Sequence, residues 1–190
     1  MMRMKSHKSF PLWFTSISCV FLFGTPLASK CGGFKLFVDK KYGYTVRYPG
    51  HWHLRVRGGG FWIESFPKAV PVVALPPGGA IVDIVVPGQL AHAGEGPPTK
   101  MDEWVSLGTG ARKVVSRDNL EISDGQRKLA ITELVTQCCA VPPYQESIDW
   151  YFMIENRMFS ANLLYWQGDP SVVKLRNMLK ELVLSMKLIR

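Results

Sequence analysis

The common catalytic motifs are absent from this 190-residue sequence. It contains no GxSxG, no phosphate-binding GxxxxGK[ST] loop and no GxGxxG after a strand. The run Gly108-Thr109-Gly110 follows a predicted helix, so we interpret it as the helix terminator and not as a phosphate cradle. No hydrolase or oxidoreductase motif supports an enzyme. We therefore predict no catalytic residue and no cofactor.

Histidine is scarce, with four in the chain. His51 and His53 are two residues apart in a predicted strand, where both imidazoles would share one face and could hold a metal. His92 lies elsewhere, and neither HExxH nor CxxC accompanies the pair. We favour two surface histidines flanking a core Trp52, and keep His51 and His53 as weak metal candidates.

Acidic residues are missing from the first 29 positions, which have the composition of an export signal. Three basic residues precede an apolar run at 10–24, and small residues follow at 26–29. This run is shorter than the roughly 20 residues that span a bilayer, so a cleaved signal peptide is favoured over an N-terminal anchor. We predict a signal peptide at 1–29, one domain at 30–190, no transmembrane segment after cleavage, and a periplasmic or extracellular location.

The net charge limits the possible partners. Residues 1–29 hold three of the 23 Lys and Arg and none of the 15 Asp and Glu, so the mature chain carries 20 minus 15, or +5. That charge favours encounters with anionic surfaces without specifying one. Nucleic acid is disfavoured for an exported protein, which leaves an envelope protein or an anionic envelope polymer.

Three cysteines remain after cleavage: Cys31, Cys138 and Cys139. Adjacent cysteines seldom bond to each other, so in an oxidising compartment we expect a disulfide between Cys31 and either Cys138 or Cys139. A redox or metal role for the vicinal pair is the alternative, although nothing nearby is suited to lowering a thiol pKa. Lipid modification of Cys31 is disfavoured because Lys30 stands before it, where a small residue is usual.

The middle of the chain predicts short strands with few helices. Residues 81–86 are almost wholly apolar and β-branched, which indicates a central strand. Asp83 within it is either a hydrogen-bonded strand residue or a buried functional carboxylate. Thr99 can cap a helix through Leu107, and residues 87–98 form a Pro/Gly-rich loop, more often disordered than functional. The other predicted strands are residues 34–38, 44–48, 51–57, 61–66, 114–122 and 126–137.

The last quarter of the chain gives the strongest fold signal. A two-residue turn at Glu155-Asn156 would place Phe152 opposite Phe159, Trp150 opposite Ala161 and Ile148 opposite Leu163. Asp169 stands where an N-cap belongs, with Pro170 after it. Apolar residues then recur at helical spacing, while Lys174, Asn177 and Glu181 mark the solvent side. The apolar residues are Val172, Leu175, Leu179, Leu182, Val183 and Met186.

The stretch Gly43–Trp52, GYTVRYPGHW, resembles the G-[FY]-x-[FVI]-x-Y-P-x-x-W opening of PsbP-like domains. This family includes the extrinsic photosystem II proteins and bacterial relatives, and its domains also end in a hairpin and an amphipathic helix, like residues 147–188 here. The resemblance implies an α+β fold, an antiparallel sheet with helices packed on both faces. It also implies a non-catalytic assembly or stabilising role. The presequence is of the bacterial secretory type, with no plant-type transit peptide.

Basic residues offer a docking surface. His53, Arg55 and Arg57 would share one strand face, with Lys40, Lys41 and Arg47 earlier in the sequence. One interpretation is a solvated strand edge that these charges protect from pairing with another chain. The alternative is a patch that docks anions.

We therefore predict an exported, non-catalytic binding, assembly or stabilising factor of the bacterial envelope. The alternative from another class is a small metal- or thiol-dependent envelope enzyme that uses His51/His53 and Cys138/Cys139.

Overall fold

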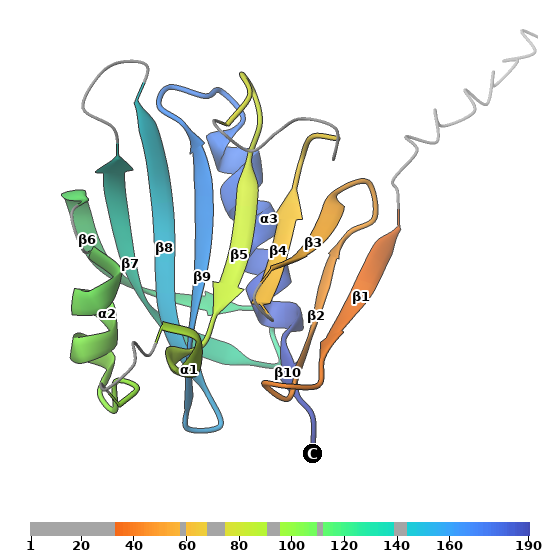
Figure 1. Cartoon of the computed structure of the whole chain (residues 1–190), viewed down its shortest axis with the longest axis vertical. Helices are drawn as coiled ribbons and strands as arrows, with labels where there is room; N and C mark the ends of the chain where they lie inside the picture. The colour runs from red at the N-terminus through yellow and green to blue at the C-terminus, as the bar shows by residue number, and fades with distance from the viewer. Residues whose placement is uncertain (1–32, 58–59, 68–74, 91–95, 110–111, 139–143) are drawn as a thin grey trace, which may run out of the picture. The chain divides into compact units, whose positions relative to one another are not determined.

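The computed structural model describes residues 33–57, 60–67, 75–90, 96–109, 112–138 and 144–190. Within these ranges the chain forms two antiparallel sheets and three helices (Figure 1). The fold is therefore α+β and mostly antiparallel, as predicted. None of the helices in the described ranges is long and apolar enough to cross a membrane.

The smaller sheet is formed by β1 (Phe34–Asp39), β2 (Tyr44–Pro49) and β10 (Lys187–Leu188), in the order β1-β2-β10. β10 pairs with the start of β2, so the chain returns to its first hairpin after the final helix. The sequence pattern missed this strand, because two residues are too few to show a period of two. Tyr44, Val46 and Tyr48 of β2 all point into the core.

The larger sheet has seven strands in the order β3-β4-β5-β9-β8-β7-β6. β5 lies between β4 and β9, which confirms the predicted central strand. The strands of this sheet are β3 (His53–Arg57), β4 (Gly60–Glu64), β5 (Ile81–Val85), β6 (Lys113–Ser123), β7 (Lys128–Cys138), β8 (Gln145–Ile154) and β9 (Arg157–Trp166).

The β8–β9 hairpin has the predicted register. Phe152 pairs with Phe159, Trp150 with Ala161 and Ile148 with Leu163. Glu155 and Asn156 have φ of 46° and 64°, the left-handed backbone that a two-residue hairpin turn requires. The register gathers the apolar side chains of both strands on one face, against the final helix.

That helix, α3 (Val172–Ser185), begins later than predicted. Ser171 occupies the N-cap position, and Asp169 Oδ1 instead accepts hydrogen bonds from the Ser171 backbone N–H and hydroxyl, both at 2.7 Å. Asp169 thus stabilises the turn before the helix. The stripe was predicted correctly: Leu179 and Leu182 are fully buried in the main core.

Two arginines fasten α3 to the sheet. Arg176 lies 3.0 Å from Glu133 of β7, whose other hydrogen bond comes from the buried Trp150 indole at 2.7 Å. At the C-terminal end, Arg127 donates to the backbone carbonyls of Met186 and Val183, at 2.7 and 3.1 Å. The Val183 carbonyl also accepts a hydrogen bond from the Met186 backbone N–H at 3.2 Å, so Arg127 adds a side-chain donor at the helix end, where carbonyls lack the regular helical partner.

A second, smaller helix contacts the other set of β8 side chains, which point away from α3. This helix, α2 (Met101–Thr109), buries Trp104 and Val105 against Leu134 and Tyr151. It extends past the predicted end at Leu107 and includes Gly108, so Gly108 is not a terminator. A Cβ at Gly108 would lie 1.8 Å from the Tyr151 hydroxyl oxygen, so glycine allows the helix to approach the sheet.

The remaining helix, α1 (Pro87–Leu90), is a single turn inside the segment predicted to be a loop. Gln89 accepts a hydrogen bond from the Val86 backbone N–H at 2.9 Å, which holds this turn to the end of β5. The next part of that loop, residues 91–95, lies outside the described ranges.

Candidate ligand-binding groove

A row of polar side chains crosses the middle of the seven-stranded sheet. Asp83 of β5 pairs in register with Asn162 of β9, and Asn162 pairs in turn with Asp149 of β8. This register places the three side chains on one face of the sheet. Tyr151, on the same face, packs under α2. Side chains alternate between the two faces of these strands. The apolar ones are buried beneath α3, and the polar ones lie on the face that α2 contacts.

Two adjoining cavities lie over this row. The larger, of about 280 Å³, is bordered by α2 and includes Trp104 and Asp149, and the smaller, of about 120 Å³, includes Ser147 and Trp62. We call the two together the polar groove. They share three lining residues: Asp83, Arg112 and Asn162.

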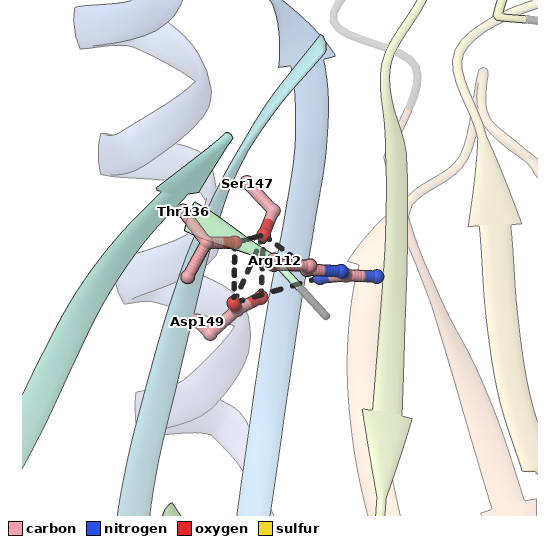
Figure 2. A network of polar contacts seen from close by, with 4 residues as sticks. All are labelled: Arg112, Thr136, Ser147 and Asp149. Carbon is pink, nitrogen blue, oxygen red and sulfur yellow. Dashed lines mark hydrogen bonds and ion pairs between the residues drawn. The ribbon is translucent and has the colours of Figure 1, made fainter. Parts of the chain in front are cut away.

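Asp149 is held at the floor of the groove by a network from three segments (Figure 2). The Ser147 hydroxyl lies 2.9 Å from each carboxylate oxygen, and the Thr136 hydroxyl lies 3.3 Å from Oδ2. Arg112, just before β6, places Nη1 3.6 Å from Oδ2 and 3.1 Å from the Ser147 oxygen. Burial raises the pKa of Asp149, which these partners partly offset.

Asp83 is the less constrained carboxylate. Burial raises the pKa of Asp83 to about 6; the hydrogen bond from Asn162 acts against this rise, the charge of Asp149 adds to it and Arg112 opposes it. The side chain is partly exposed and lines both cavities. Of the two interpretations of Asp83 from sequence, the structure supports a hydrogen-bonded residue that also faces a cavity.

The two carboxylates of the groove differ in what surrounds them. Here Asp149 is committed to Arg112, Ser147 and Thr136, which leaves Asp83 as the carboxylate available to a ligand. Asn162, Ser160 and Thr109 add neutral polar groups to the lining.

A larger cavity, of about 610 Å³, lies over β6, β7 and β8. Its lining is mostly apolar, and its two charged residues, Glu121 and Lys128, pair with each other at 3.0 Å. It supplies volume without convergent polar groups, so we place the candidate site in the polar groove.

The predicted metal candidates do not share a strand. His51 lies exposed in a turn, whereas His53 is the first residue of β3 and pairs in register with Glu64. The shared-face geometry was therefore wrong, because β3 begins two residues later than predicted. Among the described residues there is no cluster of three His, Cys, Asp or Glu suited to a metal ion.

The predicted anionic-docking residues are divided between the two sheets. Lys40 and Lys41 are exposed in the turn between β1 and β2, and exposed Arg47 of β2 lies over the Phe34 ring, 5.3 Å from its centroid. Arg55 belongs to β3 of the other sheet. The side chain of Arg57 lies outside the described part of the structure.

Arg55 is not the solvated charge that the sequence suggested. Its Nε lies 2.6 Å from Glu64 Oε2, and Glu64 is fully buried. A buried carboxylate needs such a partner, so Arg55 is fixed by the core. A docking patch on Lys40, Lys41 and Arg47 remains a prediction.

The cysteine prediction concerns side chains that the structure does not describe. Cys31 and Cys139 lie outside the described ranges, and of Cys138 the backbone alone is placed, at the end of β7. The disulfide and the thiol alternative remain predictions.

Sequence reasoning singled out Asp83 but missed the rest of the groove. Asp149 and Asn162 are central only because β5, β9 and β8 are adjacent, and Arg112 reaches them from a segment 35 residues before Ser147. The available signal was Asp149, a charged residue on the face of β8 opposite Trp150.

Comparison with known proteins gives structural matches only. No family model matches the chain, and no curated protein matches it. A crystal structure of a Bacteroides thetaiotaomicron VPI-5482 protein is similar over 82% of this chain, with 13% identity and a TM-score of 0.50. The match covers 48% of that protein, so this chain spans about half its length. At this identity the similarity concerns the fold alone.

The solution structure of cyanobacterial PsbP (CyanoP) from Synechocystis sp. PCC 6803 also matches. The match covers 87% of this chain and 98% of that one, at 14% identity and a TM-score of 0.38.

Proposed function

We propose that the protein is a non-catalytic binding or assembly factor of the bacterial envelope that recognises its partner through the polar groove. The observation behind this proposal is the difference between the two carboxylates. Asp149 is occupied by Arg112, Ser147 and Thr136, whereas Asp83 faces both cavities with Asn162 as its hydrogen-bonding neighbour. Pre-arranged polar groups at the base of a concave site are typical of ligand recognition.

Export is part of the same proposal. The basic, apolar and small-residue order of residues 1–29 supports a cleaved signal peptide, and the resemblance at Gly43–Trp52 supports an accessory role. The proposed architecture is the layered PsbP-like one, with helices over both faces of the larger sheet. The contacts of α2 and α3 with alternate side chains of β8 support it.

The test compares two matched variants in affinity capture from solubilised envelope. Leu107 lines the groove and is 54% exposed, whereas Val173 on α3 is 69% exposed and lies outside the groove. Leu107→Arg should abolish capture of the partner that the mature wild-type protein retains, because the long charged side chain blocks the groove entrance. Val173→Arg should retain it. A partner lost from both variants or from neither would place the binding site elsewhere, and capture of nothing by wild type would contradict a binding role.

A further inference from the structure

We propose that one face of the three-stranded sheet binds the surface of an anionic lipid bilayer. This face, which we call the β1 face, carries Phe34, Leu36 and Val38 of β1, Arg47 of β2 and Lys187 of β10. None of these five residues lines the polar groove, so the proposal goes beyond the function proposed above and is tested independently of it.

Large apolar side chains are exposed at every second residue of β1, the edge strand of its sheet (Figure 1). Phe34, Leu36 and Val38 are 48%, 62% and 44% exposed, whereas Phe37 packs against the main core. Successive side chains of a strand point to opposite faces, so the three exposed residues form one apolar row that points away from the core. Clustered exposed apolar residues with polar ones around them mark sites of interaction with proteins or membranes.

Basic side chains lie beside this apolar row on the same face. Leu36 pairs in register with Arg47, and Val38 pairs with Thr45, which pairs in turn with Lys187. Directly opposed residues of antiparallel strands share a face, so the exposed side chains of Arg47 and Lys187 flank the apolar row. The β1 face therefore combines apolar and positively charged groups within one small sheet.

The turn between β1 and β2 adds positive charge at one end of the β1 face. Lys40 and Lys41 are exposed in this turn, and Arg157 donates hydrogen bonds to two of its backbone carbonyls. Asp39, the acidic residue just before the turn, is buried. Its carboxylate therefore does not offset these charges at the surface.

Acidic residues lie at the opposite end of the face. Asp124 and Glu181 border a cavity of about 310 Å³ beside Phe34, the residue of the apolar row farthest from the β1–β2 turn. Glu155 of the β8–β9 turn is paired with Arg190 at 3.9 Å. The end of the β1 face nearer the β1–β2 turn is therefore the more positive one.

These charges select the occupant of the face. A second copy of the chain stacked on the same face would bring like charges together, which is unfavourable. An anionic bilayer matches both features, because its headgroups attract Lys and Arg and the boundary of its acyl chains takes up apolar side chains to a depth of about 5–10 Å. An acidic protein or polymer would be attracted by the charges alone, and the experiment tests for this.

The test is sedimentation of the mature protein with lipid vesicles. One set of vesicles is phosphatidylcholine alone, and the other is equal parts of phosphatidylcholine and the anionic lipid phosphatidylglycerol. We expect the protein to sediment with the anionic vesicles only, and the bound fraction to fall as salt is added, because salt screens exposed charges. Equal binding to both kinds of vesicle, or binding to neither, would overturn the proposal.

Leu36→Gln tests the apolar row. It should weaken binding to the anionic vesicles by about tenfold, the effect of leaving one leucine side chain in water instead of burying it. Val173→Gln, at an exposed apolar residue of α3 outside the face, should leave binding unchanged. Both side chains are exposed, so both variants should fold, and circular dichroism checks this. Full binding by Leu36→Gln would point to attraction by charge alone and would overturn insertion into a bilayer.

A pair of double variants tests the position of the charges. Lys40→Gln with Lys41→Gln should weaken binding by about twentyfold, since each basic residue near an anionic surface contributes about fivefold. Lys113→Gln with Lys174→Gln removes the same net charge at two exposed lysines, one at the start of β6 and one on α3. This second variant should bind nearly as well as wild type. Equal weakening by the two double variants would mean that net charge drives binding, and the β1 face would then not be the membrane site.

Discussion

At the scale of single residues, Gly108 sets how closely α2 lies on the sheet. A Cβ there would stand 1.8 Å from the Tyr151 hydroxyl oxygen and 2.9 Å from Cζ. Alanine normally stabilises an exposed helix position by about 1 kcal/mol over glycine. Here we expect Gly108→Ala to destabilise the fold by about 1–3 kcal/mol, the usual range for overpacking. Denaturant unfolding measures this change.

The matched control is Gly88→Ala in α1, where a Cβ would meet its nearest atom, in Tyr42, at 3.9 Å. That change should be neutral or slightly stabilising. Adding Tyr151→Phe to Gly108→Ala should recover part of the loss, since it removes the oxygen at 1.8 Å. Equal effects of the two glycine substitutions would mean that α2 does not approach the sheet this closely.

Asp83 makes stability depend on pH. Its pKa is raised from the ordinary 3.8 to about 6, chiefly by burial. Between these values the folded chain holds a proton that the unfolded chain has released, so the free energy of unfolding falls as pH rises from about 4 to about 6. Asp83→Asn removes this dependence. It should therefore differ little from wild type near pH 4 and be more stable by about 3 kcal/mol near pH 7.

Denaturant unfolding at a series of pH values gives the difference between the two proteins. Only that difference isolates Asp83, since Asp149 also has a raised pKa and remains in both. A stability difference that is constant from pH 4 to 7 would show that the Asp83 pKa is not raised.

At the scale of elements, α3 stabilises the larger sheet through its apolar stripe. Leu179 is fully buried in the main core, whereas Lys174 is exposed on the same helix. Leu179→Ala should cost about 2–5 kcal/mol, the range for emptying a core site. Lys174→Ala should change stability by no more than roughly 0.5 kcal/mol. Similar losses at both positions in urea melts would mean that the helix presents another face to the sheet.

Elements with local signals were predicted well. The β8–β9 register followed from a two-residue turn between alternating strands, and the buried side of α3 followed from helical spacing. The N-cap was predicted at the wrong residue because Asp169 accepts a hydrogen bond within the turn before the helix. Asp side chains are common both in such turns and at N-caps. β3 began later than expected because His51 belongs to a turn.

At the scale of the whole molecule, the candidate site could not have been predicted. The groove exists because β5 lies beside β9, and β9 beside β8, although about 80 residues separate Asp83 from Asn162. The Arg55–Glu64 ion pair was missed because β4 appeared from its pattern as an ordinary short strand. Alternation indicates which side chains share a face of one strand, and not which strands are neighbours.

Export concerns the chain as a whole. The composition of residues 1–29 predicts removal of the signal peptide, with a mature protein that begins near Lys30. Intact mass spectrometry of protein from the envelope fraction should give the mass of residues 30–190. Recovery of the full 190-residue chain from the cytoplasm would contradict export, and the envelope role with it.

The most direct measurement of the binding role is site-specific photo-crosslinking in the cells that produce the protein. A photoreactive phenylalanine analogue at Leu107 lies at the groove, and the same analogue at Val173 tests the exposed side of α3. The account predicts a discrete crosslinked adduct from position 107 that Asp83→Asn reduces, and none from position 173. An adduct from position 173 alone, or one at position 107 that is unchanged by Asp83→Asn, would contradict recognition through the polar groove.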